Sequence, residues 1–251
     1  IRKSKEMFRY LFRQTNKKGG GESYKLSMIW PEDFINQVIQ GDCLEVMKQM
    51  PDKCVDLVLT DPPYGMEYSR HIKNWKQEKI ENDNNLEWLP EYLEQAKRVL
   101  KDSGSIYTFC SYHNIDKFKN EIEKNFGLRN ILIWDKGGAG MGDLETTYGC
   151  VYEMCIYANK SPQKLNGKRD SDILKFRRSG NPNHPTEKPQ ALIAFLINKS
   201  SNPEAIILDP FLGSGTTAVA AKHLGRNFIG IEISEKYCEI ARGRLRQELL
   251  F

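Results

Sequence analysis

Four consecutive residues, Asp61-Pro62-Pro63-Tyr64, combine hydrogen-bond acceptors with an aromatic ring. The Asp61 carboxylate and the Pro62 carbonyl can each accept one N–H, and two such bonds would orient an amino nitrogen and raise its electron density. The prolines fix φ and hold the carbonyl in place. Tyr64 offers a face on which a planar ring can stack. The tetrad therefore predicts a site that binds and activates an amino group attached to a ring.

A second string, DPFLGSGTT at 209–217, has the composition of a ligand-binding turn. Gly213 and Gly215 allow a tight turn and a close approach of the backbone to a ligand. The string follows an apolar run at 205–208, and the tetrad follows another at 55–60. Open α/β sheets bind their ligands at the carboxyl ends of such strands. We therefore expect both motifs at one edge of a sheet.

Together the two motifs resemble those of the S-adenosylmethionine-dependent DNA amino-methyltransferases, which modify N6 of adenine or N4 of cytosine. The order, with the tetrad before the cofactor motif, resembles the β group of that family. The resemblance runs from about Val38 to Arg246 and implies catalytic roles for Asp61-Pro62-Pro63-Tyr64. It also implies direct, in-line methyl transfer to a base of double-stranded DNA, which must be flipped out of the duplex to reach such a pocket.

The resemblance implies S-adenosylmethionine as the cofactor and assigns residues to it along the chain. Glu232, at the end of an apolar run, would accept bonds from the ribose hydroxyls. Asp42 would contact the adenine of the cofactor, and it is equally suited to cap a helix over 43–50. Thr186 and Lys188, in HPTEKP at 184–189, would bind the methionine carboxylate. The expected cofactor contacts are Asp42, Asp61, Thr186, Lys188, Asp209, Phe211, Gly213, Ser214, Gly215, Thr216 and Glu232.

The stretch at about 159–183 corresponds to the target-recognition region of the β group, as a short insertion. Arginine and asparagine can read base edges, and lysine more often binds phosphates. The residues expected to bind DNA are Lys168, Arg169, Arg177 and Arg178. A solvated basic surface would explain the same charges equally well. Because the insertion is short, a homodimer or a partner subunit could supply part of the DNA contact.

Strand-like and helix-like segments alternate along the chain, which predicts an α/β fold. The expected strands are 37–40, 55–60, 105–110, 128–134, 151–157, 205–208 and 228–233. The expected helices are 43–50, 86–100, 115–125, 189–199, 216–224 and 234–249. The order of the motifs indicates a Rossmann-like, circularly permuted methyltransferase sheet of seven mostly parallel strands, with helices on both faces.

The composition fits a soluble enzyme, with 39% hydrophobic and 28% charged residues among 251. Residues 1–27 are expected to be a basic N-terminal extension of unknown role, and 28–251 the catalytic domain. We see no apolar run long enough to span a membrane. The six cysteines form no C-x-x-C pair, so we expect no metal site and reduced thiols in the cytoplasm. A net charge of +4 says little about nucleic acid.

Several alternatives remain open at this stage. Asp at the first tetrad position is more usual in adenine N6 enzymes and Ser in cytosine N4 enzymes, so the N4 reaction is the main alternative. RNA or protein amino-methyltransferases carry the cofactor motif first, which argues against them. A non-catalytic DNA-binding subunit would not need the complete tetrad. No cysteine follows a proline, which excludes the Pro-Cys nucleophile of cytosine C5 enzymes. The recognition sequence and any association with a restriction nuclease remain undetermined.

Overall fold

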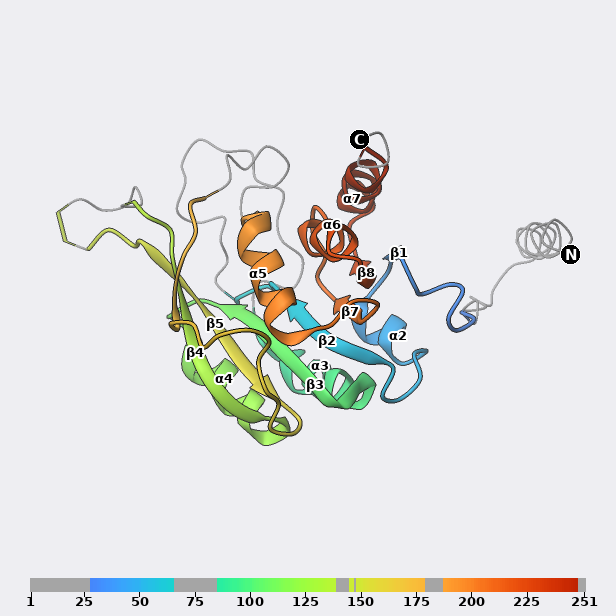
Figure 1. Ribbon diagram of the computed structural model, residues 1–251, viewed down its shortest axis with the longest axis horizontal. Helices are drawn as coiled ribbons and strands as arrows, with labels where there is room; N and C mark the ends of the chain where they lie inside the picture. Colours follow the sequence, from blue (N-terminus) through green and yellow to red (C-terminus); the bar gives the residue numbers. More distant parts are fainter. Residues whose placement is uncertain (1–27, 66–84, 139–144, 147, 179–186, 248–251) are drawn as a thin grey trace, which may run out of the picture.

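The computed structural model describes residues 28–65, 85–138, 145–146, 148–178 and 187–247. Its centre is an eight-stranded sheet with the order β1-β8-β7-β2-β3-β5-β4-β6 (Figure 1). The strands are β1 (Gln37–Gln40), β2 (Val55–Thr60), β3 (Leu100–Cys110), β4 (Gly127–Asp135), β5 (Tyr152–Asn159), β6 (Ile173–Lys175), β7 (Ile206–Asp209) and β8 (Asn227–Glu232). The expected N-terminal extension at 1–27 lies outside the described residues.

All seven expected strands are present, but the expected number is wrong because β6 adds an eighth. This strand has only three residues, and one of them, Leu174, is buried. Such a short segment carries no periodic pattern that distinguishes a strand from a loop. It pairs in parallel with the edge strand β4. The α/β class is therefore confirmed, and the permuted origin of the chain order stays a prediction.

The sheet is mostly parallel, as expected, with β5 as the exception. β1, β8, β7, β2 and β3 pair in parallel in that order. β5 runs antiparallel to both of its neighbours, β3 and β4. The start of β5 therefore lies at the same edge of the sheet as the carboxyl ends of β3 and β4. Residues that open β5 thus join the edge where ligands are expected.

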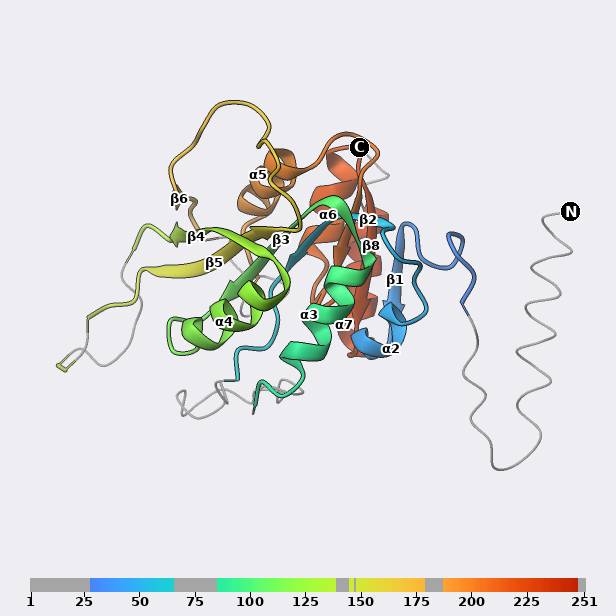
Figure 2. The same cartoon turned by 90° about the horizontal axis from the view of Figure 1, so that it is seen from below.

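Helices cover both faces of the sheet (Figures 1 and 2). One face carries α2 (Cys43–Met47), α3 (Leu89–Val99) and α4 (Ile115–Asn125), and the other carries α5 (Gln190–Ser200), α6 (Thr216–His223) and α7 (Glu235–Gln247). Both faces of β2 are buried under these helices. Val58 packs into the core beneath α2, α3 and α4, whereas Leu57 and Leu59 pack into the core beneath α5, α6 and α7, and all three are fully buried. A parallel strand covered on both faces reads as one continuous apolar run.

The segment between β5 and β6 is anchored to the carboxyl end of α5. The side-chain amide of Asn166 donates to the carbonyls of Asn198 and Ser201, each at 3.0 Å. The ammonium of Lys199 donates to the carbonyls of Asn166 and Lys168, at 2.7 and 2.6 Å. This part of the segment expected to recognise DNA is therefore held to the second helical layer.

The helix lengths and the state of the cysteines can be stated for the whole described part of the chain. Every helix within it is too short or too polar to cross a lipid bilayer. All six cysteines lie within the described ranges and carry free thiols.

Two glycines provide a matched test of packing between sheet and loop. A Cβ on Gly230 in β8 would come within 2.5 Å of the Leu212 side chain, whereas a Cβ on Gly243 in α7 would meet nothing within 4 Å. We expect Gly230→Ala to lower the free energy of unfolding by about 1–3 kcal/mol through overpacking. Gly243→Ala should raise it by about 0.5–1 kcal/mol because alanine favours a helix. Urea denaturation of both variants measures this difference, and equal effects would contradict the packing described here.

Candidate active site

The two sequence motifs meet where β2 and β7 end side by side. β2 pairs with β7, which places Thr60 beside Asp209. The Thr60 hydroxyl donates to Asp209 Oδ1 at 2.9 Å, and this oxygen also accepts the Phe211 N–H at 3.1 Å. One buried carboxyl group therefore connects the strand that leads into Asp61 with the turn that follows β7. The expectation that both motifs lie at one edge is confirmed.

Asp209 was expected to contact the cofactor, but its carboxyl group bonds to the protein. Asp209 is buried, with only 4% of its surface exposed. Burial raises the pKa of Asp209 to about 7, although hydrogen bonds from Thr217, Thr60 and Phe211 act in the opposite direction. The geometry thus assigns Asp209 to holding the turn, and direct cofactor contact stays a prediction.

The glycine turn after β7 has the backbone that the motif predicts. Gly213 and Gly215 have φ of +53° and +91°, which residues with a Cβ rarely adopt. A Cβ on Gly215 would lie 2.7 Å from that of Ala241, so glycine lets α6 approach α7 closely. A Cβ on Gly213 would meet no atom within 4 Å, so this side of the turn faces open space. The turn and the N-terminus of α6 thus fit a small ligand that approaches the backbone.

Glu232 and Asp42 lie at neighbouring strand ends beside this turn. β1 pairs with β8 so that Gln40 faces Glu232. Glu232 accepts the Gly213 N–H at 2.8 Å and the Ser234 N–H at 2.9 Å. Asp42 caps α2 by accepting the N–H of Leu44 at 2.9 Å. The capping role expected for Asp42 is confirmed, and the cofactor contacts expected of both acids stay predictions.

Phe211 continues from the turn into an aromatic cluster. Its ring centroid lies 5.1 Å from that of Trp88 and 5.5 Å from that of Tyr92. Tyr92 is fully buried in α3, and Trp88 precedes that helix. The partly buried Phe211 ring therefore gives the edge of the site an apolar wall, formed together with residues of the first helical layer.

Ser214 and Thr216 belong to a polar network that the sequence did not indicate. Arg244 in α7 donates to the Ser214 carbonyl at 2.9 Å and to the Thr216 hydroxyl at 3.2 Å. Its guanidinium group also pairs with Glu187 at 2.9 Å, and Thr216 donates to the same carboxylate oxygen at 3.2 Å. The side chain of Glu187 is 6% exposed. Arg244 therefore joins the HPTEKP string to the glycine turn.

The tetrad at 61–64 leaves β2 with its carboxylate already engaged. Asp61 Oδ2 accepts from the Lys188 ammonium at 2.5 Å, and Asp61 Oδ1 accepts from the Tyr64 hydroxyl. The buried side chain of Asn114, which precedes α4, donates to the Tyr64 carbonyl at 2.7 Å. Burial, followed by the negative charges of Asp61 and Glu153, raises the pKa of Tyr64 well above its usual value. Tyr64 is therefore a hydrogen-bond donor here and stays protonated.

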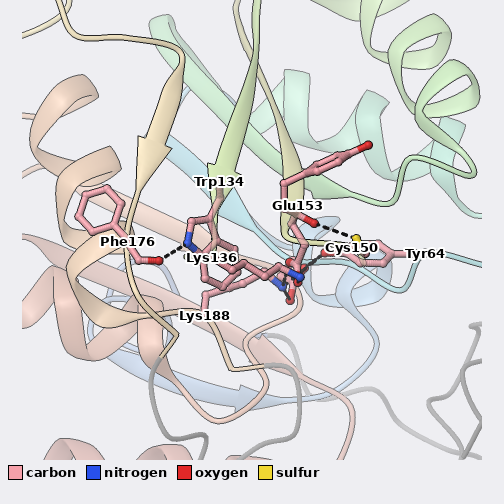
Figure 3. A network of polar contacts seen from close by, with 9 residues as sticks. Tyr64, Trp134, Lys136, Cys150, Glu153, Phe176 and Lys188 are labelled. Carbon is pink, nitrogen blue, oxygen red and sulfur yellow. Dashed lines mark hydrogen bonds and ion pairs between the residues drawn. The ribbon is translucent and has the colours of Figure 1, made fainter. Parts of the chain in front are cut away.

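Lys188 is shared between two acids, Asp61 and Glu153, and Figure 3 labels Lys188 together with Glu153. Besides Asp61, its Nζ lies 3.1 Å from Oε2 of Glu153, the second residue of β5. Glu153 Oε1 pairs with Lys136, just after β4, at 2.6 Å. Burial alone would lower the pKa of Lys188 and raise that of Glu153, but the opposite charges around each group reverse both shifts. Lys188 and Glu153 are therefore both charged at neutral pH.

This cluster changes the expectation for the HPTEKP string. Lys188 was expected to bind the methionine carboxylate of the cofactor, and the structure places its ammonium against the Asp61 carboxylate. The cofactor contact stays a prediction. Thr186, the other residue assigned to that carboxylate, lies outside the described residues. Sequence reasoning missed Glu153 and Lys136, although an acid within the otherwise apolar start of β5 was an available signal.

The four residues expected to bind DNA are all exposed. Lys168 and Arg169 lie on the anchored segment before β6, and Arg177 and Arg178 lie just after it. Their exposure permits contact with a large polyanion, and the structure records no DNA. The DNA-binding assignment therefore stays a prediction.

Two cysteines lie near the tetrad. Burial, and then the charge of Asp61, raises the pKa of Cys110 to about 12. The pKa of Cys155 is likewise raised, mainly by burial. Since only a thiolate is an effective nucleophile, neither residue is suited to covalent catalysis. Across the described ranges, no three His, Cys, Asp or Glu side chains are grouped to hold a metal ion.

The geometry can be compared with known proteins. A family model described as DNA methylase matches residues 55–243, from β2 into α7. That range contains both the tetrad and the glycine turn. This chain belongs to the DNA methylase family. The predicted family is confirmed.

Curated relatives of this DNA methylase match most of its length. It is 32% identical over 252 residues to the type II methyltransferase M.HinfI of Haemophilus influenzae, covering 86% of this chain and 69% of the relative. It is 31% identical over 256 residues to the DNA adenine methyltransferase YhdJ of Escherichia coli strain K12, covering 86% of this chain and 85% of the relative.

Solved structures agree with the fold of this DNA methylase. The M1.HpyAVI-SAM complex has a TM-score of 0.65 at 30% identity, covering 83% of this chain and 98% of that one. The PvuII DNA methyltransferase (cytosine-N4-specific) has a TM-score of 0.69 at 18% identity, covering 84% of this chain and 89% of that one. The second likeness shows the fold alone.

The buried carboxyl group of Asp209 predicts a characteristic pH dependence. In the unfolded chain this group ionises near pH 4, whereas the folded protein keeps it protonated up to about pH 7. The unfolded state thus binds fewer protons between these values, so the contribution of Asp209 to stability falls as pH rises. We expect the stability of Asp209→Asn relative to wild type to increase by up to about 4 kcal/mol from pH 4 to 7.5.

Urea denaturation at several pH values measures this change, with the exposed Asp116→Asn as the control. A relative stability of Asp209→Asn that stays constant or falls with rising pH would contradict the assignment.

Proposed function

We propose that this DNA methylase transfers a methyl group from S-adenosylmethionine to N6 of adenine in double-stranded DNA. The observation that carries the proposal is the junction of the complete tetrad with the glycine turn through Thr60 and Asp209. The two curated relatives, at 31 and 32% identity, support it by name: one is a type II methyltransferase and the other a DNA adenine methyltransferase. We place the enzyme in the cytoplasm.

The residues around the turn fit the expected cofactor. When bound, S-adenosylmethionine supplies an electrophilic methyl group. Glu232 and Asp42 offer carboxylates at adjacent strand ends, suited to hydroxyl and amino donors. The open side of Gly213 allows backbone contact. Phe211 adds an apolar surface. We assign the remaining expected contacts, including Thr186 and Lys188, to the methionine end.

The tetrad acts on the amino group of the target base. The lone pair of that nitrogen is delocalised into the ring, which makes it a poor nucleophile. Asp61 and the Pro62 carbonyl accept its two N–H groups and so orient the lone pair. Tyr64 presents its ring to the flipped base and donates its hydroxyl to Asp61, which fixes the carboxylate. Methyl transfer is direct in this proposal, and the raised pKa values of Cys110 and Cys155, the two cysteines described near the tetrad, fit a reaction without a thiolate nucleophile.

The recognition segment at about 159–183 supplies the DNA contacts in this proposal. Arg177 and Arg178 read bases or phosphates, and Lys168 and Arg169 bind phosphates. The short length of the segment leaves room for a second subunit, either a second copy of this chain or a partner.

The decisive experiment is methylation of unmethylated genomic DNA by wild type and Asp61→Ala, with nucleoside analysis of the product. Wild type should form N6-methyladenine, and the variant should lose at least about 100- to 1,000-fold in rate because an oriented acceptor is removed. Calorimetry should find that both proteins bind S-adenosylmethionine. N4-methylcytosine as the product would overturn the adenine assignment in favour of the cytosine alternative. Methylation of RNA or protein alone, or binding without turnover, would overturn the DNA proposal.

The DNA-binding residues make a separate prediction about salt. Each phosphate contact contributes about −0.9 to the slope of log affinity against log salt concentration. The double variant Arg177→Gln/Arg178→Gln should therefore reduce that slope by up to about two and weaken binding at low salt. Fluorescence anisotropy with a labelled duplex measures both quantities.

The matched control is Lys97→Gln/Lys117→Gln, which removes two exposed charges from α3 and α4. It should leave the slope within experimental error of wild type. Equal slopes for the two double variants would refute the assignment of the arginines.

A further inference from the structure

The free protein presents a conflict at its catalytic carboxylate. Both Asp61 oxygens are engaged, Oδ2 by the Lys188 ammonium at 2.5 Å and Oδ1 by the Tyr64 hydroxyl. The proposed function, on which this inference rests, requires Asp61 to accept an N–H from the target amino group. A buried ammonium in a charge-assisted bond is a strong competitor for that position. Each carboxylate oxygen can accept two hydrogen bonds, so the target N–H would share Oδ2 with Lys188 and weaken the Lys188 bond.

A second acceptor for the Lys188 ammonium is already in place. Glu153 Oε2 lies 3.1 Å from Lys188 Nζ, close enough for an ion pair. This oxygen is buried, and its contact with Lys188 is a longer ion pair than the 2.5 Å bond that Lys188 makes to Asp61. A buried carboxylate oxygen that is weakly bonded is costly, so a shorter bond from Lys188 would be favourable there. A small displacement of Lys188 away from Asp61 would form it.

The surroundings keep Lys188 close to both acids. Lys188 is only 5% exposed. Its Nζ lies 5.1 Å from the ring centroid of Phe109 and 5.8 Å from that of Tyr64. Lys136 pairs with the other oxygen of Glu153 at 2.6 Å and so fixes the orientation of this carboxylate. Two lysines and two acids give the cluster no net charge, and a shift of Lys188 between the acids leaves this balance unchanged.

We propose that Glu153 is a positioning residue for methyl transfer, which takes over the hydrogen bond of Lys188 and so makes Asp61 Oδ2 available to the target amino group. Glu153 does not contact the base in this arrangement. Its negative charge matters because a neutral side chain of the same shape would leave Lys188 on Asp61. The effect should therefore appear in the chemical step, and the affinities for cofactor and DNA should be unaffected.

Glu153→Gln tests the role of the charge at constant size. We expect its single-turnover rate of adenine methylation to fall about 10- to 100-fold, in the range expected for loss of a hydrogen bond to a charged group. The dissociation constants for S-adenosylmethionine and for duplex DNA should stay within about twofold of wild type. Glu121→Gln in α4 is the matched control, because the exposed fractions of the two glutamate side chains are similar, 23% for Glu121 and 26% for Glu153. Glu121 also pairs with a lysine. This control should keep the wild-type rate.

Two variants with a shorter side chain at position 153 repeat the comparison if Glu153→Gln does not unfold cooperatively. Glu153→Asp retains the charge and Glu153→Asn removes it, so the aspartate variant should be about 10-fold faster or more. Equal single-turnover rates for the charged and neutral variants would overturn the positioning role. So would a neutral variant that weakens DNA binding at an unchanged rate. A wild type that methylates no adenine would overturn the proposed function and this inference together, whereas an active wild type with an equally active Glu153→Gln would overturn the inference alone.

Discussion

The pairing of β2 with β7 is the constraint on which the rest of the site depends. It brings Thr60 against Asp209 across a separation of 149 residues, and a single buried carboxyl group then bonds to both strand ends. The tetrad that follows β2 and the glycine turn that follows β7 therefore have fixed relative positions before any ligand binds. Preorganisation of this kind lowers the entropic cost of bringing two reactants into line.

The charged cluster around Lys188 is stable only because its members compensate one another. An isolated buried ion costs several kcal/mol, on the order of what a whole domain can spare. Here Asp61, Lys188, Glu153 and Lys136 alternate in sign through contacts of 2.5–3.1 Å. Removal of Glu153, for example, would leave Lys136, whose side chain is 10% exposed, without its carboxylate partner. The position of the Lys188 ammonium therefore depends on what else is bonded to Asp61, including an incoming N–H group.

Much of this architecture could be predicted from the sequence, because apolar runs ending in motifs locate the ends of parallel strands. The bounds of β2 and α4 agree with the expected ranges, and the position of both motifs at one edge of the sheet followed from strand polarity. The antiparallel direction of β5 could not be predicted, because side-chain alternation is the same in both directions. That direction is what brings Glu153 to the site.

Other parts depended on long-range contacts that leave no local pattern. The three residues of β6 are defined only by pairing with β4. Asn114 and Arg244 look like ordinary polar residues of helical segments, and their roles follow from which backbone carbonyls they reach in the folded chain. The sequence also placed Lys188 near the cofactor on the basis of resemblance, and its geometry associates it first with Asp61.

The anchoring of the recognition segment has a consequence for how such enzymes diverge. Asn166 and Lys199 hold that segment to α5 largely through backbone carbonyls, which every residue type provides. β6 adds main-chain pairing at the margin of the sheet. Side chains elsewhere on the segment can therefore be exchanged by mutation without loosening its attachment or disturbing the strands that carry the tetrad. The segment to which we assign DNA recognition is therefore a natural unit for transplantation in protein engineering.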